Sequence, residues 1–512
     1  MSNTYSPLPE QVDTVVIGGG TGGAAFTGVL ATHTDESILL LEAGPDHGPY
    51  ADGGWPADML SAKSIPLSHD YDLTTTRTSG AGVLDLPRAR ILGGCSAHNG
   101  CTASVSARYD YDEWAAQGNP SWAANRVAPL LEWVHNRFRV RRYTMDELTP
   151  PQRAFVEAGV AAGLPFADDL DTLEAAEGIG PMPVNIVDTV DGSGRRIGVR
   201  WNSAFAFLDA VRDRSMIAGE SPVDRIDVRD GVAQGVWVTR GGEQSYVAAG
   251  RVVVAAGAYH SPALLLASGI GPADELAALG IEVVVDLPGV GRHLLDHECV
   301  QLDFAGRAGL LDEIAAMDWD PDEQTVGRAR SSVCDGGPYD IHVFMVAGAN
   351  SGHPGLPPVS LYGGAMRAKS EGTVTLGPDR DVVTPVIEHR YGTAEEDRIV
   401  LREALALLER MCAQPGLAEV LGERVVSGSG DPLDDIVNYC HPAGTCKLGP
   451  PTDPTAVVGD DGAVHGVSGL YVADASIMPA ITRGNINLPT AMIGANIAAQ
   501  LADVAISDIT GG

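Results

Sequence analysis

The N-terminal part of the chain alternates between short apolar runs and one glycine-rich turn. Residues 12–17 form an apolar run, residues 18–23 are almost all glycine, and residues 24–31 are small and apolar. A second apolar run, residues 37–41, ends at Glu42. Continuous apolar runs of this length, bounded by a turn, are typical of buried parallel strands. The pattern therefore predicts a strand, a helix and a second strand, which together form a βαβ unit.

The turn of this unit carries a G-x-G-x-x-G motif at Gly18, Gly20 and Gly23. The first glycine permits a tight turn, the second lets the backbone approach a pyrophosphate, and the third lets helix and strand pack closely. Thr21 lies in the same turn, where the helix N-terminus offers amides and a positive dipole end to phosphates. Glu42 can accept hydrogen bonds from ribose hydroxyls and argues against a 2′-phosphate. The unit predicts a dinucleotide site, with FAD and NAD both open.

The remaining pattern predicts further strands and helices and no internal repeat. Turn residues at 230–231 and 241–242 divide alternating segments into a three-stranded meander. After a buried strand at 251–258, Ser261 and Pro262 predict a helix start, with serine as the cap and proline in the first turn. We expect the meander strands at 224–228, 232–239 and 245–247, other helices from 110–114 and at 122–140, 151–162, 202–214 and 394–413, and alternating segments at 339–346 and 372–376.

Composition and charge narrow the class of protein. The 512 residues are too many for a single core and suggest two or three domains. With 34 basic and 67 acidic residues, the formal net charge is −33, which repels phosphate backbones and anionic lipid, so neither nucleic acid nor a membrane is an expected partner. We see no secretory signal at the N-terminus and expect a cytoplasmic monomer or homodimer with free thiols. No cysteine pair has zinc-ligand spacing, so no metal site is predicted.

A second glycine-rich stretch, Gly93 to Gly100, contains a cysteine, a histidine and an asparagine. Neither a helix nor a strand favours such a sequence, whereas a loop whose backbone amides approach a ligand closely requires it. The hypothesis is that this loop lies along the cofactor, with Gly94, His98 and Asn99 beside it.

Four blocks, in order over essentially the whole chain, resemble the glucose–methanol–choline (GMC) oxidoreductase family. They are the N-terminal βαβ unit, residues 87–114, residues 257–272 followed by 288–297, and three segments between residues 441 and 490. The resemblance implies FAD rather than NAD as the cofactor. It also implies oxidation of a small alcohol by hydride transfer to flavin N5, with electrons passed to O2 or to another acceptor. A dehydrogenase that does not use oxygen and a lyase that keeps FAD structurally remain open alternatives.

The same resemblance implies an α/β fold with two domains. One is an FAD-binding Rossmann-like domain, formed discontinuously by residues 1–118, 187–298 and 440–512. The other is a substrate-binding domain of mixed or antiparallel sheet plus helices, formed by residues 119–186 and 299–439.

The resemblance places the catalytic base on His441. A histidine suits this role because its unperturbed pKa lies near neutrality, and Pro442 restricts the loop that carries it. Asn485 stands where relatives carry His or Asn. An amide is not a base at neutral pH, so Asn485 is expected to donate a hydrogen bond to the substrate oxygen. Asn487, two residues further on, competes for that role and otherwise contacts the cofactor.

His98 immediately precedes Asn99, as in choline oxidases, in which that histidine is covalently attached to the flavin. The alternative is that His98 only packs beside the flavin ring. Asp474 resembles the residue that binds the ribityl chain, and Val223 stands where relatives pair backbone with adenine. The flavin contacts implied by the resemblance are Gly94, His98, Asn99, Gly100, Val223, Asp474, Ala475 and Asn487.

The chain departs from choline oxidases at several positions. Gly100 stands where they carry a serine. His342 lies near the family's third active-site histidine, but its spacing favours Phe344 as the counterpart. No carboxylate is matched to the one that pairs with a quaternary ammonium, so an alcohol other than choline is expected. Three nearby acids are interpreted as a solvated acidic loop: Asp320, Asp322 and Glu323.

Overall fold

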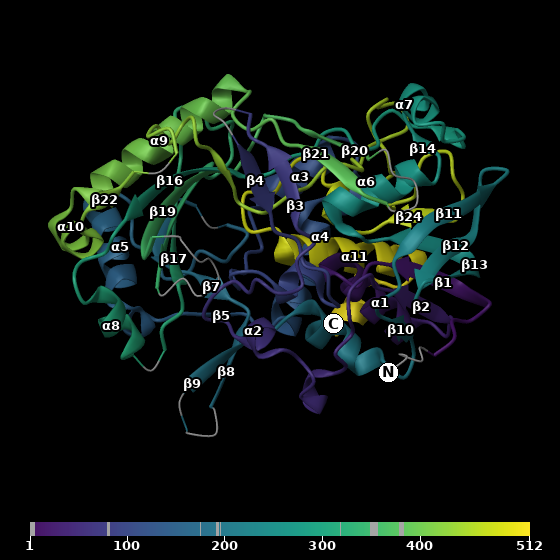
Figure 1. The fold of residues 1–512 in the computed structure, drawn as a ribbon, viewed down its shortest axis with the longest axis horizontal. Coiled ribbons are helices and arrows are strands. Elements are labelled where there is room, and N and C mark those ends of the chain that lie inside the picture. Colours follow the sequence, from purple (N-terminus) through teal and green to yellow (C-terminus); the bar gives the residue numbers. More distant parts are fainter. Residues whose placement is uncertain are drawn as a thin grey trace.

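The computed structural model describes residues 6–511 apart from residues 79–81, 175, 191–193, 195, 318, 349–356, 378–382 and 427. Two large β-sheets stand at opposite ends of the molecule, each with helices packed against it (Figure 1). This arrangement confirms the α/β fold class with two sheet-based parts.

The first sheet has the strand order β10-β2-β1-β13-β12-β11, and β24 pairs with β13. β1 runs parallel to β2 and to the last part of β13, and helix α1 (Thr21–His33) connects β1 to β2. The βαβ unit predicted at the N-terminus is therefore confirmed. The strands are β1 (Gln11–Ile17), β2 (Ile38–Leu41), β10 (Met216–Ala218), β11 (Val223–Arg229), β12 (Val232–Arg240), β13 (Glu243–Val254) and β24 (Leu470–Val472).

The predicted meander is present, but its third strand is longer than predicted. The segments expected at 245–247 and 251–258 are one continuous strand, β13. Its first part pairs antiparallel with β12, and its last residues pair parallel with β1 and β24. The sequence suggested two strands because residues 248–251 are partly exposed, which interrupts the apolar pattern.

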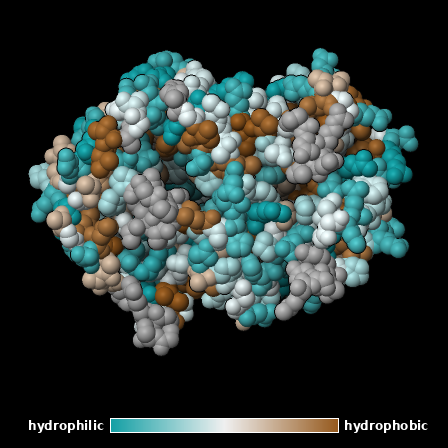
Figure 2. Space-filling model, viewed as in Figure 1, coloured by the Kyte–Doolittle hydropathy of each residue, from teal (hydrophilic) through white to brown (hydrophobic). Residues whose placement is uncertain are grey.

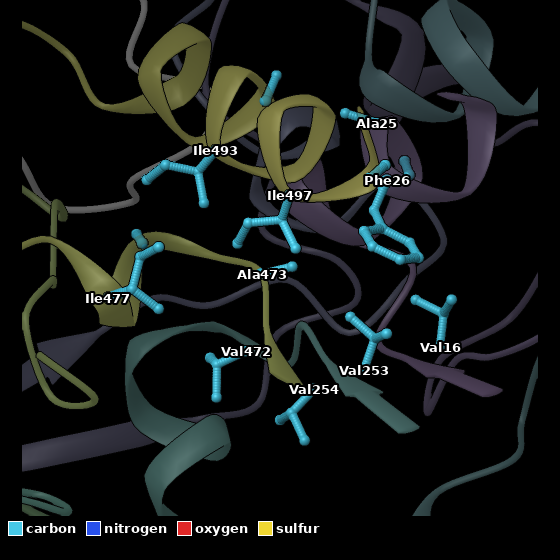
Figure 3. Close-up of a cluster of buried hydrophobic side chains, with 14 of the residues drawn as sticks. Val16, Ala25, Phe26, Val253, Val254, Val472, Ala473, Ile477, Ile493 and Ile497 are labelled. Atoms are coloured by element: carbon cyan, nitrogen blue, oxygen red, sulfur yellow. The ribbon is translucent and has the colours of Figure 1, made fainter. Parts of the chain in front are cut away.

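Helices α1 and α11 (Asn487–Leu501) cover one face of the first sheet, and apolar side chains fill the space between the helices and the sheet (Figure 3). Phe26 of α1 and Ile497 of α11 point toward Val253 of β13. The two helices approach closely because small residues meet: a β-carbon on Gly494 would lie 2.1 Å from the carbonyl oxygen of Gly22. This contact brings the N-termini of both helices to the same edge of the sheet.

Helix α6 (Gly257–Ala267) begins before Ser261, so the helix start predicted at Ser261 and Pro262 is wrong. A proline inside a helix lacks the N–H that would bond the carbonyl four residues earlier, here that of Ala258. The Thr445 hydroxyl donates to this carbonyl at 2.6 Å instead. The orphaned carbonyl is satisfied from a distant segment, which local sequence rules do not consider.

The second sheet has the order β22-β16-β19-β18-β17-β6, with β23 beside β16, and its pairings are antiparallel. Helices α5 (Pro150–Ala161), α9 (Glu395–Cys412) and α10 (Pro415–Leu421) share its hydrophobic core, and the first two confirm predicted helices. The strands are β6 (Gly178–Pro181), β16 (Glu298–Phe304), β17 (Glu323–Ala329), β18 (Ile341–Ala347), β19 (Val359–Ala365), β22 (Arg424–Val425) and β23 (Val437–Asn438).

Further, mostly shorter elements complete the fold. Helix α4 (Ala124–Arg137) packs into the core of the first sheet. The helix predicted at 202–214 is present in part and is not a regular α-helix, because the chain forms a π-helical turn, Ala204–Leu208, followed by a 3₁₀ turn, Asp209–Val211. The predicted domain boundaries stay predictions. The other elements are α2 (Ala57–Leu60), α3 (Arg108–Ala116), α7 (Ala273–Ala278), α8 (Leu310–Ala315), α12 (Ile506–Thr510), β3 (Leu73–Thr76), β4 (Val83–Leu86), β5 (Arg141–Arg142), β7 (Pro183–Val184), β8 (Ile186–Val190), β9 (Arg196–Arg200), β14 (Ile270–Gly271), β15 (Val285–Asp286), β20 (Thr373–Leu376) and β21 (Pro385–Glu388).

The face of the molecule seen in Figure 2 is mostly hydrophilic, with hydrophobic residues in small separate groups. Among the described residues, no helix has the length and apolar character that a membrane crossing requires.

Candidate active site

A cavity of about 930 Å³ lies between the two sheets and is lined from both. At the first sheet it meets the carboxyl ends of β1 and β2, which is where open α/β sheets bind ligands. At the second sheet it meets residues of β16, β17, β18 and β19. Every residue predicted to bind cofactor or substrate lines this cavity except Gly23: Gly18, Gly20, Thr21, Glu42, Gly94, His98, Asn99, Gly100, Val223, His441, Asp474, Ala475, Asn485 and Asn487.

The three glycines of the first motif have different surroundings. Gly18 has a φ of +100°, which a tight turn requires, and a β-carbon there would lie 2.4 Å from the Ala255 oxygen. A β-carbon on Gly23 would lie 2.0 Å from the oxygen of Gly18, so Gly23 serves the close packing of helix and strand. A β-carbon on Gly20 would have the Cα of Gly94 as its nearest neighbour, at 3.8 Å. The backbone of Gly20 borders the cavity. This backbone is accessible to a phosphate group.

Two helix N-termini open on the same cavity. Thr21 begins α1 and Asn487 begins α11, and the Thr21 hydroxyl donates to Asn487 Oδ1 at 3.0 Å. Among the described residues, the buried Nδ2 of Asn487 has no hydrogen-bond partner, so one donor is left for a ligand. Two positive helix ends and an unused amide donor suit an anionic, acceptor-rich dinucleotide.

Glu42 is buried at the end of β2, and the backbone holds its carboxylate. Oε2 accepts from the Gly19 N–H at 2.8 Å and Oε1 from the Gly44 N–H at 2.7 Å. Burial raises the pKa of this carboxyl, and these two backbone donors oppose the rise. Each carboxylate oxygen keeps a lone pair for a further donor, so the group is still able to bind ribose hydroxyls.

The second glycine loop turns sharply through Gly93 and Gly94, whose φ angles are +92° and +52°. L-residues rarely adopt these angles, which explains the glycine pair. The turn presses against the first motif, because a β-carbon on Gly94 would lie 2.7 Å from the Gly20 Cα. The loop places the buried side chain of His98 at the cavity. The Nε2 of His98 lies 3.7 Å from Asp70 Oδ2.

Asp474 is tied to the protein by three donors. Its Oδ1 accepts from the Ser476 N–H at 2.8 Å, and its Oδ2 accepts from the Gly257 N–H at 2.8 Å and from the Ser261 hydroxyl at 2.5 Å. Ser261 thus positions Asp474 and does not cap a helix. Asp474 borders the cavity, and its role toward the ribityl chain stays a prediction.

His441 lies between two polar partners. Its Nδ1 is 2.9 Å from His297 Nδ1, and its Nε2 is 3.4 Å from Asn485 Nδ2. His297 is fully buried, and its Nε2 lies 3.0 Å from the Thr482 carbonyl oxygen. The His441 ring also stacks on Tyr439, with centroids 4.6 Å apart.

Asp296 holds both histidines through the backbone. Its Oδ1 accepts from the His441 N–H at 2.7 Å and from the His297 N–H at 2.8 Å, while its Oδ2 accepts from the Tyr391 hydroxyl at 2.8 Å. Burial raises the pKa of Asp296 to about 6. The carboxylate therefore fixes the position of the two imidazoles without touching either ring.

Burial keeps both imidazoles neutral. It lowers the pKa of His297 to about 3. Burial, followed by the charges of His297 and Arg88, holds the pKa of His441 well below its ordinary value of 6.5. At neutral pH each ring therefore carries one N–H and one unprotonated nitrogen.

The structure adds residues to which sequence reasoning gave no role. His297 belongs to a block that resembles the family, yet it lies 144 residues from His441, and no local pattern pairs them. Phe344, rather than His342, borders the cavity, as the spacing favoured. Neither ring nitrogen of the buried His342 has a hydrogen-bond partner among the described residues.

The interpretation of the acidic stretch 320–323 as a solvated loop is wrong for its last two residues. Asp322 and Glu323 line the cavity, and Glu323 is the first residue of β17. Asp320 pairs with Lys63, whereas within the described part of the chain neither Asp322 nor Glu323 forms an ion pair. Three acids in four positions suggested solvent exposure, but the start of a strand turns the last two toward the cavity.

Comparison with known proteins identifies the family. Models of the GMC oxidoreductase family match residues 12–299 and 368–494. The chain is 31% identical to the oxygen-dependent choline dehydrogenase of Brucella anthropi and 32% identical to that of Rhizobium etli, each over 94% of both chains. The structure of pyridoxine 4-oxidase from Mesorbium loti superposes with a TM-score of 0.80 at 26% identity, over 95% of this chain and 98% of that one. Formate oxidase of Aspergillus oryzae RIB40 shares the fold, with a TM-score of 0.83 at 20% identity, over 98% of this chain and 99% of that one.

These matches, together with the fold and the cavity between its sheets, place the chain among flavin-dependent oxidoreductases. The family model that matches residues 12–299 by itself spans more than half of the sequence, so the chain belongs to the GMC oxidoreductase family. It is an FAD-dependent enzyme that acts on CH–OH groups.

Substituting Gly94 by alanine should lower FAD content several-fold. The added β-carbon would collide with the backbone of Gly20 and strain the left-handed turn, so the two glycine segments would separate where the cofactor is expected. The measurement is the ratio of flavin to protein absorbance after purification. Gly416→Ala is the matched control, because nothing lies within 4 Å of its β-carbon position. Full flavin content in Gly94→Ala would contradict the assignment of this loop to the FAD-binding site.

Proposed function

We propose that this protein oxidises an alcohol to an aldehyde or ketone, with His441 as the base that takes the hydroxyl proton. FAD, when bound, supplies the acceptor for the hydride from the carbinol carbon. The single observation that carries this proposal is the hydrogen-bond chain from Thr482 through His297 to His441, because it leaves a basic nitrogen facing Asn485.

The chain of hydrogen bonds determines which nitrogen of His441 is basic. A carbonyl oxygen only accepts, so His297 Nε2 carries a proton and donates it to Thr482. Because His297 is neutral, its Nδ1 has a lone pair and accepts from the Nδ1–H of His441. His441 Nε2 is then unprotonated. It is the nitrogen within reach of Asn485 and able to accept a proton from an alcohol.

Asn485 supplies the second interaction that the reaction needs. Its Nδ2–H donates toward His441 Nε2 at 3.4 Å, a long and weak contact. An alcohol oxygen placed against both groups would give its proton to Nε2 and accept from Nδ2–H. The amide would then stabilise negative charge that develops on the oxygen, as a fixed donor does in an oxyanion hole.

The residues that would hold FAD follow the cavity from one sheet to the other. The Gly18–Gly20 turn and the α1 N-terminus suit the phosphates, and Glu42 suits a ribose. The loop that ends at Gly100 and the α11 N-terminus at Asn487 suit the flavin, with the positive helix end favouring negative charge on the ring.

Oxygen is the electron acceptor we propose, because relatives of the chain are named as an oxygen-dependent dehydrogenase and an oxidase. The test is to mix the purified yellow protein with small alcohols under argon and then under air. Bleaching of the flavin by an alcohol under argon, followed by peroxide under air, would support an oxidase. Bleaching with dye reduction but no peroxide would make it a dehydrogenase. A flavin that no alcohol bleaches would contradict the oxidation itself and favour a lyase.

We also propose that His98 is bonded covalently to the flavin. It is buried at the end of the Gly93–Ala97 turn, and the carboxylate of Asp70 lies 3.7 Å from Nε2. A nearby carboxylate can orient an imidazole and increase its basicity. The link would replace one C–H bond of the flavin 8α-methyl group with a C–N bond, and the two electrons lost by that carbon would be taken up by the flavin itself and passed on to O2.

Acid precipitation tests this link. The pellet should stay yellow and the polypeptide should gain the mass of one FAD, while His98→Ala should release its colour to the supernatant. His135→Ala is a suitable control, since His135 also pairs with an aspartate but does not line the cavity. Colour in the supernatant from the unmodified protein would leave His98 with a packing role only.

A further inference from the structure

Helix α3 holds the backbone segment that ends at the active-site amide, residues 480–485. Trp114 of α3 donates from Nε1 to the first carbonyl of this segment at 2.9 Å. Glu113 of α3 binds the guanidinium of Arg367 at 2.6 and 2.8 Å, and this guanidinium donates to the Ile481 carbonyl at 2.7 Å. Two side chains of one helix therefore fix the start of the segment.

A buried ion pair holds the middle of the segment. The side chains of Asp110, in the first turn of α3, and of Arg483 are both 0% exposed. Asp110 Oδ1 pairs with the Arg483 guanidinium, and Oδ2 accepts from the Arg483 backbone N–H at 2.9 Å. One carboxylate therefore binds both the side chain and the main chain of a residue that lies 373 positions away in the sequence.

The peptide unit between Thr482 and Arg483 connects this carboxylate to the proposed base. Its N–H donates to Asp110, and its carbonyl oxygen, which belongs to Thr482, lies 3.0 Å from His297 Nε2. A peptide unit is planar and trans, so its N–H and C=O point in opposite directions and do not turn separately. A hydrogen bond from the N–H to a buried carboxylate also polarises the unit and makes its oxygen a better acceptor. Asp110 thus orients and strengthens the acceptor on which the tautomer of His297 depends.

Two glycines make room for this arrangement. The Gly484 N–H donates to the Ser106 hydroxyl oxygen at 3.1 Å, and a β-carbon on Gly484 would lie 2.8 Å from the same oxygen. A β-carbon on Gly337 would overlap the guanidinium of Arg483. The backbone is therefore fixed at the two residues directly before Asn485, and both glycines are needed for the close packing.

Stability alone does not explain a fully buried ion pair. Removing two charges from water costs about as much as their attraction returns, and apolar residues of similar volume are often equally stabilising. The Arg483 guanidinium is also held by Asp335 at 3.1 Å and lies over the ring of Tyr109, 4.8 Å from its centroid. An apolar pair would lack one thing that Asp110 provides, which is a fixed acceptor for a backbone N–H.

We propose that Asp110 is a positioning residue for the proton transfer, because through the peptide unit of Thr482 and Arg483 it holds the acceptor that fixes the tautomers of His297 and His441. The hydrogen-bond chain runs from the Asp110 carboxylate through this peptide unit and His297, and it ends at Nε2 of His441. The effect on rate rests on the proposed function, whereas the effect on the tautomers does not require turnover.

Asp110→Asn tests the effect on rate. Asparagine has the same shape but only one acceptor oxygen, so it loses the contact to the guanidinium or the contact to the N–H. The rate of flavin bleaching under argon, at saturating alcohol, should fall about 10- to 100-fold, the range for a group that orients a functional imidazole. The KM and the flavin content should change little, because Asp110 does not line the cavity.

Nitrogen-15 NMR of histidine-labelled protein tests the tautomers without turnover. His297→Leu and His441→Gln identify the signals of the two rings. The unmodified protein should show a proton on Nε2 of His297 and on Nδ1 of His441. In Asp110→Asn both rings should show a mixture of tautomers, because the Thr482 carbonyl is no longer held in place.

Variants of Arg483 separate the backbone contact from the ion pair. Arg483→Met keeps Asp110 and the backbone N–H, so it should retain most of the rate. Asp110→Leu combined with Arg483→Met replaces the pair by apolar side chains of similar volume, so it should keep the thermal stability but have a rate as low as that of Asp110→Asn.

Glu36→Gln is the matched control outside the cavity. Its carboxylate also binds an arginine and a second donor, with Arg251 on Oε1 and the Thr14 hydroxyl on Oε2, both at 2.7 Å. Glu36 does not line the cavity, and its replacement should leave the rate and the histidine tautomers unchanged.

The outcomes distinguish this positioning role from the proposed oxidation. Equal rate losses in Asp110→Asn and Arg483→Met, or unchanged histidine tautomers in Asp110→Asn, would overturn the role of Asp110. In a His297→Leu background Asp110→Asn should have little further effect, and losses that multiply in full would also overturn it. If no alcohol bleaches the flavin but the tautomers change in Asp110→Asn, the positioning role holds and the proposed oxidation does not.

Discussion

His441→Gln should lower kcat about 10²- to 10⁴-fold, the range for loss of a positioned general base. The structure gives Nε2 of His441 as the unprotonated nitrogen beside Asn485, and glutamine offers no comparable base there. FAD content should be unchanged, because no proposed cofactor contact is removed. The measurement is the rate of flavin bleaching under argon, with the substrate saturating.

The pH dependence provides a second readout for His441. Its pKa is held well below 6.5, mainly by burial, so the base stays neutral and the rate of the unmodified enzyme should fall only at pH values below 6.5. In His441→Gln this acid limb should vanish, and the rate should rise with pH as more alcohol ionises. A variant that keeps more than about a tenth of the rate would exclude His441 as the base.

His297→Leu should lower kcat about 10- to 100-fold, the usual effect of removing a group that orients a functional side chain. Leucine has no acceptor for the Nδ1–H of His441, so the proton is free to reside on either nitrogen and the ring loses a 2.9 Å hydrogen bond. His297→Asn should recover part of the rate, because its Oδ1 can replace the acceptor near Nδ1. Bleaching rates and substrate affinity, measured separately, should show the loss in kcat and little change in KM.

His342→Leu is the matched control for this substitution. His342 is buried like His297, but it does not line the cavity, and its ring nitrogens lack hydrogen-bond partners among the described residues. Its replacement should leave kcat almost unchanged and should not reduce stability, since two unsatisfied polar atoms are removed. Equal rate losses in His297→Leu and His342→Leu would indicate general loosening of the core and would contradict a positioning role for His297.

Local patterns predicted the elements that contiguous sequence signals define. The βαβ unit and helices α5 and α9 follow apolar periodicity and turn residues, and all three are present. The predictions failed where a distant segment replaces a local interaction. The Thr445 hydroxyl donates to the Ala258 carbonyl, which has no helical N–H partner because residue 262 is proline. Pairing with β1 keeps β13 a continuous strand through its partly exposed residues.

The sequence by itself determined the dinucleotide unit, the family and many of the residues that line the cavity, because these residues lie in motifs that can be recognised locally. Only the tertiary structure decided which of those residues touch. His297 meets His441 across 144 residues, and this contact determines the tautomer of the proposed base. Glu323 and Gly100 meet across two sheet-based parts, and this contact turns an apparently solvated acid into a cavity wall. A motif lies within one segment and can be recognised in the sequence, whereas hydrogen bonds and packing between segments depend on how the whole chain folds.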